Sequence, residues 1–154
     1  MENTREFLRH ILAAVAYRAE RALEGAPEHF ANFDGAGRQP VQILAHMGDL
    51  YVWALSSVRG DSEWHGSTPL PWAAERARFT AALQSFDAYL ASAEPLHAPI
   101  ERLFQGPIAD SLTHIGQLAM LRRLAGCKMK GENYYVAEIV VGRLAEQAAP
   151  VRTF

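Results

Sequence analysis

Apolar residues recur every three or four positions through most of this chain, which is the period of an amphipathic α-helix. The pattern predicts four long helices, over about residues 4–24, 40–59, 71–92 and 107–126. A shorter fifth helix is expected over about residues 134–148, where Leu144 and Ala145 continue a helical pattern after Gly131. No run alternates between apolar and polar residues for long enough to require a strand.

Glycine and proline mark the ends of these predicted helices. Pro40 suits the first position of the second helix, and Gly60 ends it. Gly106 and Pro107 are expected to begin the fourth helix, and Gly126 to end it. The chain has no internal repeat or linker, so we predict an all-α fold: a single four-helix-bundle domain over residues 1–154, up-down with a long connection, plus the short C-terminal fifth helix.

Composition narrows the class of protein. The 154 residues are 49% hydrophobic and 21% charged, with a net charge of −2. Such a chain is too apolar to be disordered. No run reaches the ~18 apolar residues that a membrane span needs. The small negative net charge does not attract nucleic acid, which is itself negatively charged. We therefore predict neither a membrane nor a nucleic-acid partner. The single cysteine, Cys127, suits a reducing compartment, and mixed charges flank the apolar run at 11–17, so we predict a cytoplasmic location.

Three residues stand out as candidate metal ligands. Asp110 and His114 are four residues apart on the predicted fourth helix, which places their Cβ atoms ~5–6 Å apart on its core side. His46, on the predicted second helix, lies where an apolar arc of residues gives way to a polar arc. If these two helices are neighbours, the three side chains converge.

Two imidazoles and one carboxylate suit Zn²⁺ with an open fourth position. The same set matches the facial triad that binds Fe(II), and nickel and manganese also fit. The alternative interpretation is an ion pair between Asp110 and His114, with His46 an ordinary core histidine. The residues alone leave both interpretations open, because an Asp and a His at this spacing are a weak pattern.

The sequence around these residues resembles that of the DinB/YfiT-like superfamily of four-helix bundles. In that superfamily the last long helix carries H-x-x-x-H followed by Gly-Gln and Leu-Arg elements. Residues 108–126 have this pattern with Asp110 at the first His position. An earlier helix of the superfamily carries a single His after Ile-Leu-Ala, as residues 41–47 do. The resemblance implies a divalent metal held by His46, Asp110 and His114. Asp110 stands where many members have the first His, although mycothiol-dependent maleylpyruvate isomerases have Glu there.

The resemblance also implies a function. Characterised relatives include transferases and isomerases that use mycothiol, bacillithiol or glutathione, so we expect a metal-dependent enzyme, a thiol transferase or isomerase or a hydrolase. Its substrate would be a small molecule or a low-molecular-weight thiol. The alternative is a non-catalytic, stress-associated bundle protein that binds a metal or a small molecule. Relatives are often dimers, so a homodimer is also expected.

Other residues near these ligands are weaker candidates. Asp49, three residues after His46, would be a fourth ligand or a base beside the site. Trp53, on the same stripe as His46, would line a pocket, whereas Trp64 and Trp72 are expected to pack in the core. Gln117, three residues after His114, would either donate a hydrogen bond to the site or simply pack between helices.

Overall fold

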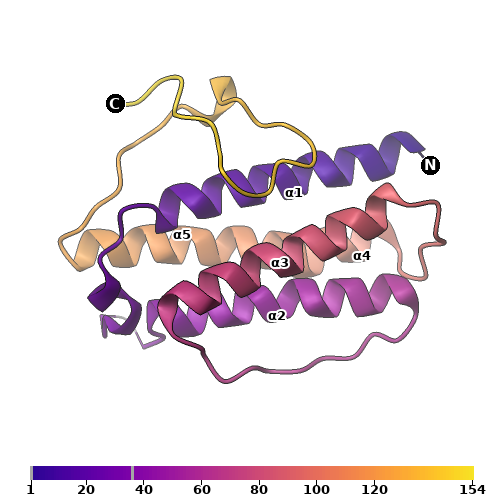
Figure 1. The fold of residues 1–154 in the computed structure, drawn as a ribbon, viewed down its shortest axis with the longest axis horizontal. Coiled ribbons are helices and arrows are strands. Elements are labelled where there is room, and N and C mark those ends of the chain that lie inside the picture. Colours follow the sequence, from indigo (N-terminus) through magenta and orange to yellow (C-terminus); the bar gives the residue numbers. More distant parts are fainter. Residues whose placement is uncertain (1, 36) are drawn as a thin grey trace.

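A computed structural model describes residues 2–35 and 37–154 as an all-α four-helix bundle, as the apolar pattern predicted (Figure 1). Three of its long helices are α1 (Glu2–Leu23), α2 (Pro40–Arg59) and α3 (Trp72–Ala91). The fourth is continuous and contains α4 (Ile100–Leu103), the π-helical turn η2 (Phe104–Ile108) and α5 (Ala109–Leu124). Short 3₁₀ turns lie at η1 (Glu28–Asn32) and η3 (Tyr134–Val136). The described residues form no strand, only an isolated bridge between Glu132 and Thr153.

Burial of one apolar face of each helix holds the bundle together. Leu12, Leu44, Leu83 and Leu118, one from each long helix, are all completely buried in one hydrophobic core. Burying a side chain of this size contributes about 1.5–3 kcal/mol, so the core outweighs any single polar contact. Core packing therefore fixes the positions of α2 and α5, and with them the positions of the side chains on these two helices.

The fourth helix begins earlier than predicted. It starts at Ile100, directly after Pro99, and Pro107 lies inside η2 rather than at the first turn. Proline lacks an N–H and clashes with the preceding turn of an α-helix, so it is usually found in the first turn and not in the interior. For this reason Gly106 and Pro107 were expected to mark the start of the helix. The wider π-helical turn accommodates Pro107 without ending the helix.

The predicted fifth helix over residues 134–148 is wrong, since only η3 is helical there. Gly142 and Glu146 have positive φ angles of 82° and 52°, which an α-helix does not allow. Side chains of α1 hold this C-terminal segment instead. The buried carboxylate of Glu132 accepts hydrogen bonds from Tyr17 and Arg21.

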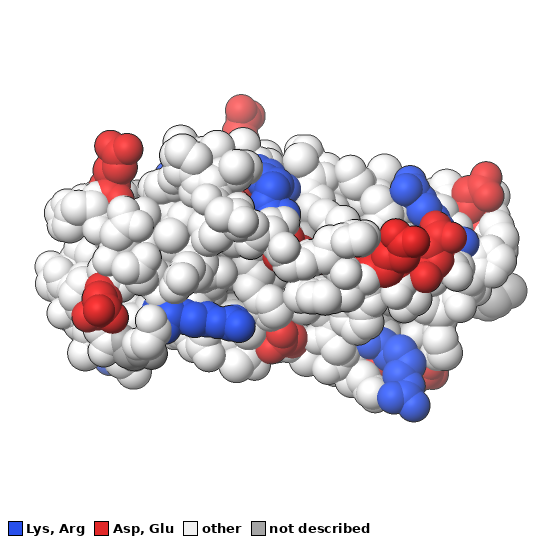
Figure 2. All heavy atoms as spheres, turned by 90° about the horizontal axis from the view of Figure 1, so that it is seen from below, with Lys and Arg blue, Asp and Glu red and all other residues white. Residues whose placement is uncertain are grey.

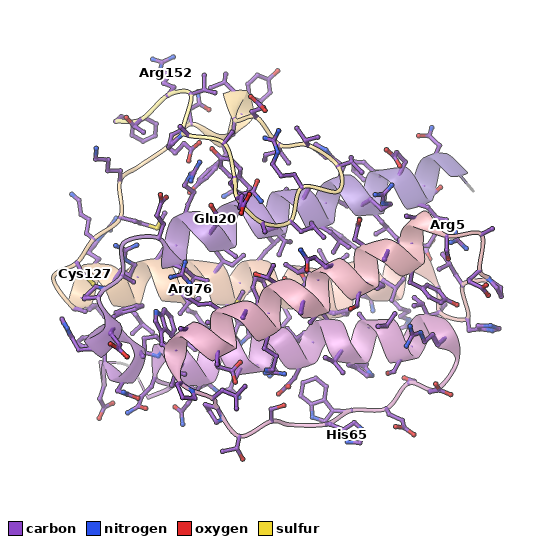
Figure 3. All side chains as sticks on the ribbon, viewed as in Figure 1. Arg5, Glu20, His65, Arg76, Cys127 and Arg152 are labelled. Atoms are coloured by element: carbon purple, nitrogen blue, oxygen red, sulfur yellow. The ribbon has the colours of Figure 1, made fainter. Side chains whose placement is uncertain are left out.

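A second contact ties the C-terminal segment to α1. Glu20, labelled in Figure 3, accepts a hydrogen bond of 3.1 Å from the backbone of Gln147. The segment therefore crosses α1 as an irregular strap, as Figure 1 shows.

Among the described residues, none of the helices combines the length and the apolar character needed to cross a membrane. On the face drawn in Figure 2, acidic and basic side chains are few and interspersed.

Candidate metal centre

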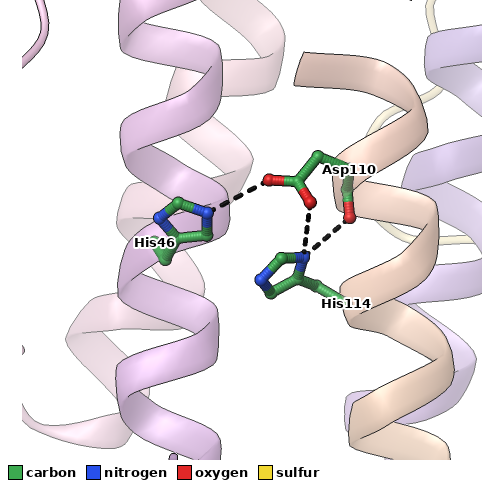
Figure 4. A group of neighbouring side chains, drawn as sticks. All are labelled: His46, Asp110 and His114. Atoms are coloured by element: carbon green, nitrogen blue, oxygen red, sulfur yellow. Dashed lines mark hydrogen bonds and ion pairs between the residues drawn. The ribbon is translucent and has the colours of Figure 1, made fainter. Parts of the chain in front are cut away.

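His46 of α2 meets Asp110 and His114 of α5 in the space between these two helices (Figure 4). Each residue offers one ligand atom, and these atoms all lie within 4.8 Å of one another. The Nε2 atom of His46 is 3.2 Å from Oδ2 of Asp110, and Nδ1 of His114 is 3.3 Å from Oδ1. Residues 64 positions apart in the sequence are thus joined in one polar group.

The helix backbone orients the ring of His114. Its Nδ1 is 2.7 Å from the backbone carbonyl oxygen of Asp110, one turn earlier, and this is shorter than its distance to the Asp110 carboxylate. In the neutral imidazole, Nδ1–H therefore donates to the carbonyl, and Nε2 keeps its lone pair. A hydrogen bond from the other ring nitrogen is the usual way in which proteins fix the tautomer of a metal-binding histidine.

The centre lies at the edge of the core and opens to solvent through Asp110. The side chain of His114 is 9% exposed and that of His46 is 22% exposed, whereas that of Asp110 is 42% exposed. Asp110 thus lies at the rim and not inside the core, so its charge needs no buried counter-ion. An ion or a small molecule can reach the group from this side.

The group fits a divalent metal in donor type and in spacing. Zn²⁺ is held by imidazole nitrogen and carboxylate oxygen at ~2.0–2.2 Å, so two ligand atoms of a tetrahedral site are about 3.3 Å apart. The 3.2 Å between His46 Nε2 and Asp110 Oδ2 is close to this separation, and all the ligand atoms of the group lie within 4.8 Å of one another. Three protein ligands leave one position free, which is the pattern of catalytic rather than structural zinc sites.

Trp64, on the loop between α2 and α3, contacts the ring of His46. Its ring lies 5.6 Å from the His46 ring, with the planes at 62°, and 6.0 Å from the ring of Trp53 at 84°. The expectation that Trp64 packs in the core is wrong, because it is 47% exposed, whereas Trp72 is buried as expected. The available signal was the loop itself, since a Trp in a polar stretch rich in Gly and Ser has no core to enter.

Trp53 lies beside a separate hollow. It lines a cavity of about 440 Å³ together with Gly106 of η2 and His97. Its link to the metal centre runs through Trp64, because its ring contacts Trp64 and Trp64 contacts His46.

Asp49 does not belong to the metal centre, contrary to its proposed role as a fourth ligand or base. Its buried carboxylate accepts hydrogen bonds from the backbone N–H and the hydroxyl of Ser67, at 2.9 and 2.7 Å. Arg78 of α3 donates a third, also at 2.9 Å. Asp49 therefore anchors the loop that carries Trp64.

Arg78 completes this anchor. It donates to the backbone oxygen of Ala45 and to the fully buried carboxylate of Glu75, which in turn accepts from the backbone N–H of Leu70. Burial disfavours the charge of Arg78, but hydrogen bonds to Glu75 and Asp49 outweigh it and raise the pKa of Arg78 above its ordinary value. A permanently charged guanidinium thus joins α2, α3 and the loop.

Gln117 lies one turn beyond His114 and makes no hydrogen bond to the centre within the described part of the chain. It lines a groove that begins at His114. His65 is exposed and pairs with Glu63 at 3.3 Å, and Cys127 lies just beyond the end of α5 (Figure 3). Neither residue belongs to the group at His46.

Comparison of the chain with protein-family models, with curated proteins and with solved structures found no match.

Proposed function

We propose that this chain binds a divalent metal ion through His46, Asp110 and His114 and acts as a metal-dependent enzyme of the DinB-like type. Its nucleophile would be a low-molecular-weight thiol or water, which makes the chain a thiol transferase or isomerase or a hydrolase. The observation that carries the proposal is the convergence of two imidazoles and one carboxylate from separate helices. The resemblance of residues 41–47 and 108–126 to the DinB/YfiT-like superfamily supports the same ligand set.

The donor set favours zinc, and Fe(II), Ni(II) and Mn(II) also accept two imidazoles and a carboxylate. A divalent cation with a free coordination position lowers the pKa of a thiol or water that binds it, so that the nucleophilic anion is available near pH 7. The residues around the centre suit such a role. The Asp110 carbonyl orients His114, the ring of Trp64 packs against the ring of His46, and the exposed Asp110 gives a substrate access.

Metal analysis of protein purified without an affinity tag tests the first step. We expect about one equivalent of a transition metal, bound at purification or taken up on titration at neutral pH. His46→Asn and His114→Asn should lose it, whereas His65→Asn, which changes an exposed histidine outside the group, should retain it. Less than ~0.1 equivalent, with no uptake on titration, would refute the metal centre.

Two reactions test the second step. Glutathione conjugation of 1-chloro-2,4-dinitrobenzene reports thiol transfer, and hydrolysis of p-nitrophenyl acetate reports activated water. We expect one of these rates to depend on the added metal and to fall to the background level in His114→Asn. A protein that binds the metal but accelerates neither reaction in a metal-dependent manner would support the non-catalytic alternative.

A further inference from the structure

A mainly apolar groove leads away from the metal centre along the surface between α2 and α5. It has a volume of about 430 Å³, within the ~300–1,000 Å³ range of small-molecule sites. Its walls carry the side chains of Ile43, Met120, Leu121 and Leu124, and His114 lies at its inner end. The groove and the metal centre therefore share a residue.

The groove ends near Arg38, just before α2 begins at Pro40. Because α2 and α5 run in opposite directions, the start of α2 lies beside the end of α5 (Figure 1). His46 is six residues beyond Pro40, which is ~9 Å along a helix axis. A molecule that spans the groove thus has one end at the metal centre and the other at Arg38.

Charge in the groove comes from Arg38. No acidic residue lines the groove, and Gln117 is its other polar wall residue besides His114. Arg38 is exposed and forms no ion pair with the side chains that the structure describes. A guanidinium in this position is suited to bind a carboxylate through two parallel hydrogen bonds.

We propose that this groove binds an organic carboxylate with an apolar body, whose carboxylate pairs with Arg38 and whose far end reaches His114. Met120 and Leu124 are more than half exposed, and an apolar ligand body that covers them gains free energy by removing their surface from water. The proposal deepens the proposed function and rests on it only for the metal at the far end, since binding at Arg38 needs no ion.

The first experiment uses octanoate and protein freed of metal with EDTA, measured by isothermal titration calorimetry. We expect octanoate to bind the wild-type chain and to bind Arg38→Met about tenfold more weakly, as is typical when a hydrogen-bonded charge pair is lost. Methyl octanoate, which has no charge, should bind both proteins equally and weakly. Arg123→Met is the matched control, because Arg123 lies on α5 but lines a different hollow.

The proposal that the groove binds a carboxylate is refuted if octanoate fails to bind the wild-type chain or binds Arg38→Met with unchanged affinity. It is also refuted if Arg123→Met weakens octanoate binding as much as Arg38→Met does. Helical circular dichroism of Arg38→Met should match the wild type, since Arg38 is exposed and outside the helices. A failure to bind zinc affects none of these measurements and would refute only the proposed function.

A second experiment tests whether the groove leads to the metal. Octanedioate carries a carboxylate at each end, so zinc should increase its affinity for the wild-type chain, and His114→Asn should abolish the increase. If zinc binds but leaves the affinity for octanedioate unchanged, the far end of the ligand does not reach the centre and that part of the proposal fails.

Discussion

The ring of Trp64 packs against the ring of His46, with centroids 5.6 Å apart and planes at 62°. This contact joins a loop between two helices to the only candidate ligand on α2. The Nδ1 atom of His46 has no hydrogen-bond partner among the described residues, so we expect the Trp64 indole to limit the rotation of this ring, as a hydrogen bond to Nδ1 does at His114. The loop is thus part of the site although it contributes no ligand.

Replacing Trp64 with Ala should weaken zinc binding by about 2- to 10-fold, the equivalent of one aromatic contact. The His46 ring would lose the surface that limits its rotation, whereas stability should change little because Trp64 is half exposed. Competition with a zinc chelator measures the affinity. Trp64→Phe, which keeps an aromatic face, should recover most of it; equal affinities for all three proteins would contradict the orienting role.

Asp49→Asn should lower the free energy of unfolding by about 1.5–3 kcal/mol, since it removes one of the two carboxylates that pair with half-buried Arg78 and weakens the hydrogen bonds from Ser67. Urea denaturation measures this loss. Asp61→Asn, in the exposed part of the same loop, is the control and should lie within ~0.5 kcal/mol of the wild type. Equal stability of the two variants would contradict the proposed contribution of Asp49 to holding the loop.

Zinc should stabilise the whole bundle, because it binds the folded arrangement of α2 and α5. At a free zinc concentration about 100 times Kd, the gain is about 2.7 kcal/mol, which raises Tm by several degrees in a chain of this size. Differential scanning calorimetry with zinc and with EDTA measures the shift. His114→Asn should show no shift, and a zinc-dependent increase in that variant would place the ion elsewhere.

Tyr51 should make the chain less stable at high pH. Burial raises the pKa of its phenol well above the ordinary value, and the hydrogen bond with Ser111 offsets this only in part. Above pH ~10 the unfolded chain releases the proton while the folded chain keeps it, so stability present at lower pH is lost by about 1.4 kcal/mol per pH unit.

Tyr51→Phe removes this dependence. We expect its free energy of unfolding to be about 1 kcal/mol lower than wild type at neutral pH, from the lost hydrogen bond, and the difference to shrink above pH 10. Urea denaturation between pH 7 and 11 measures it. Tyr135→Phe, at a position that is 96% exposed, should follow the wild type at every pH.

Glu132→Gln should loosen the C-terminal strap while leaving the four helices intact. The buried Arg21 loses its buried charged partner and keeps only the exposed Glu24, at a cost of about 3 kcal/mol to the contact between the strap and α1. Limited proteolysis should then cut residues 133–154 faster than in the wild type. The exposed ion pair of Glu138 provides the control, so Glu138→Gln should be cut at the wild-type rate.

The four-helix bundle could be predicted because each long helix has a continuous apolar face. On α3, for example, the buried residues Phe79, Leu83, Phe86 and Leu90 are spaced three or four residues apart. The path of the segment after Gly131 could not be predicted. Its apolar residues are spaced as in a helix, but buried polar contacts from Tyr17 and Arg21 determine its path. Such contacts lie more than 100 residues away in the sequence and leave no local pattern.

The convergence of His46, Asp110 and His114 could be predicted from helix spacing once α2 and α5 are assumed to be neighbours. Helix spacing left the choice between a metal site and an ion pair open, and the prediction that the three residues are metal ligands came from the resemblance to the DinB/YfiT-like superfamily. The roles of Asp49 and Trp64 could not be predicted from the sequence, because both depend on the path of the loop over residues 60–71. That path is fixed by Ser67 binding Asp49, a contact that no periodic pattern encodes.

The π-helical turn sets the rotational phase of the last helix. Leu103 and Ile108 are both buried although they are five residues apart, and in a regular α-helix such positions point about 140° away from each other. The wide turn absorbs this angle, so the stretch before it packs on the core while Asp110 and His114, just after it, point at His46. Deleting one residue from η2 would turn the two faces relative to each other, and the helix would have to give up either its buried contacts or its alignment with α2.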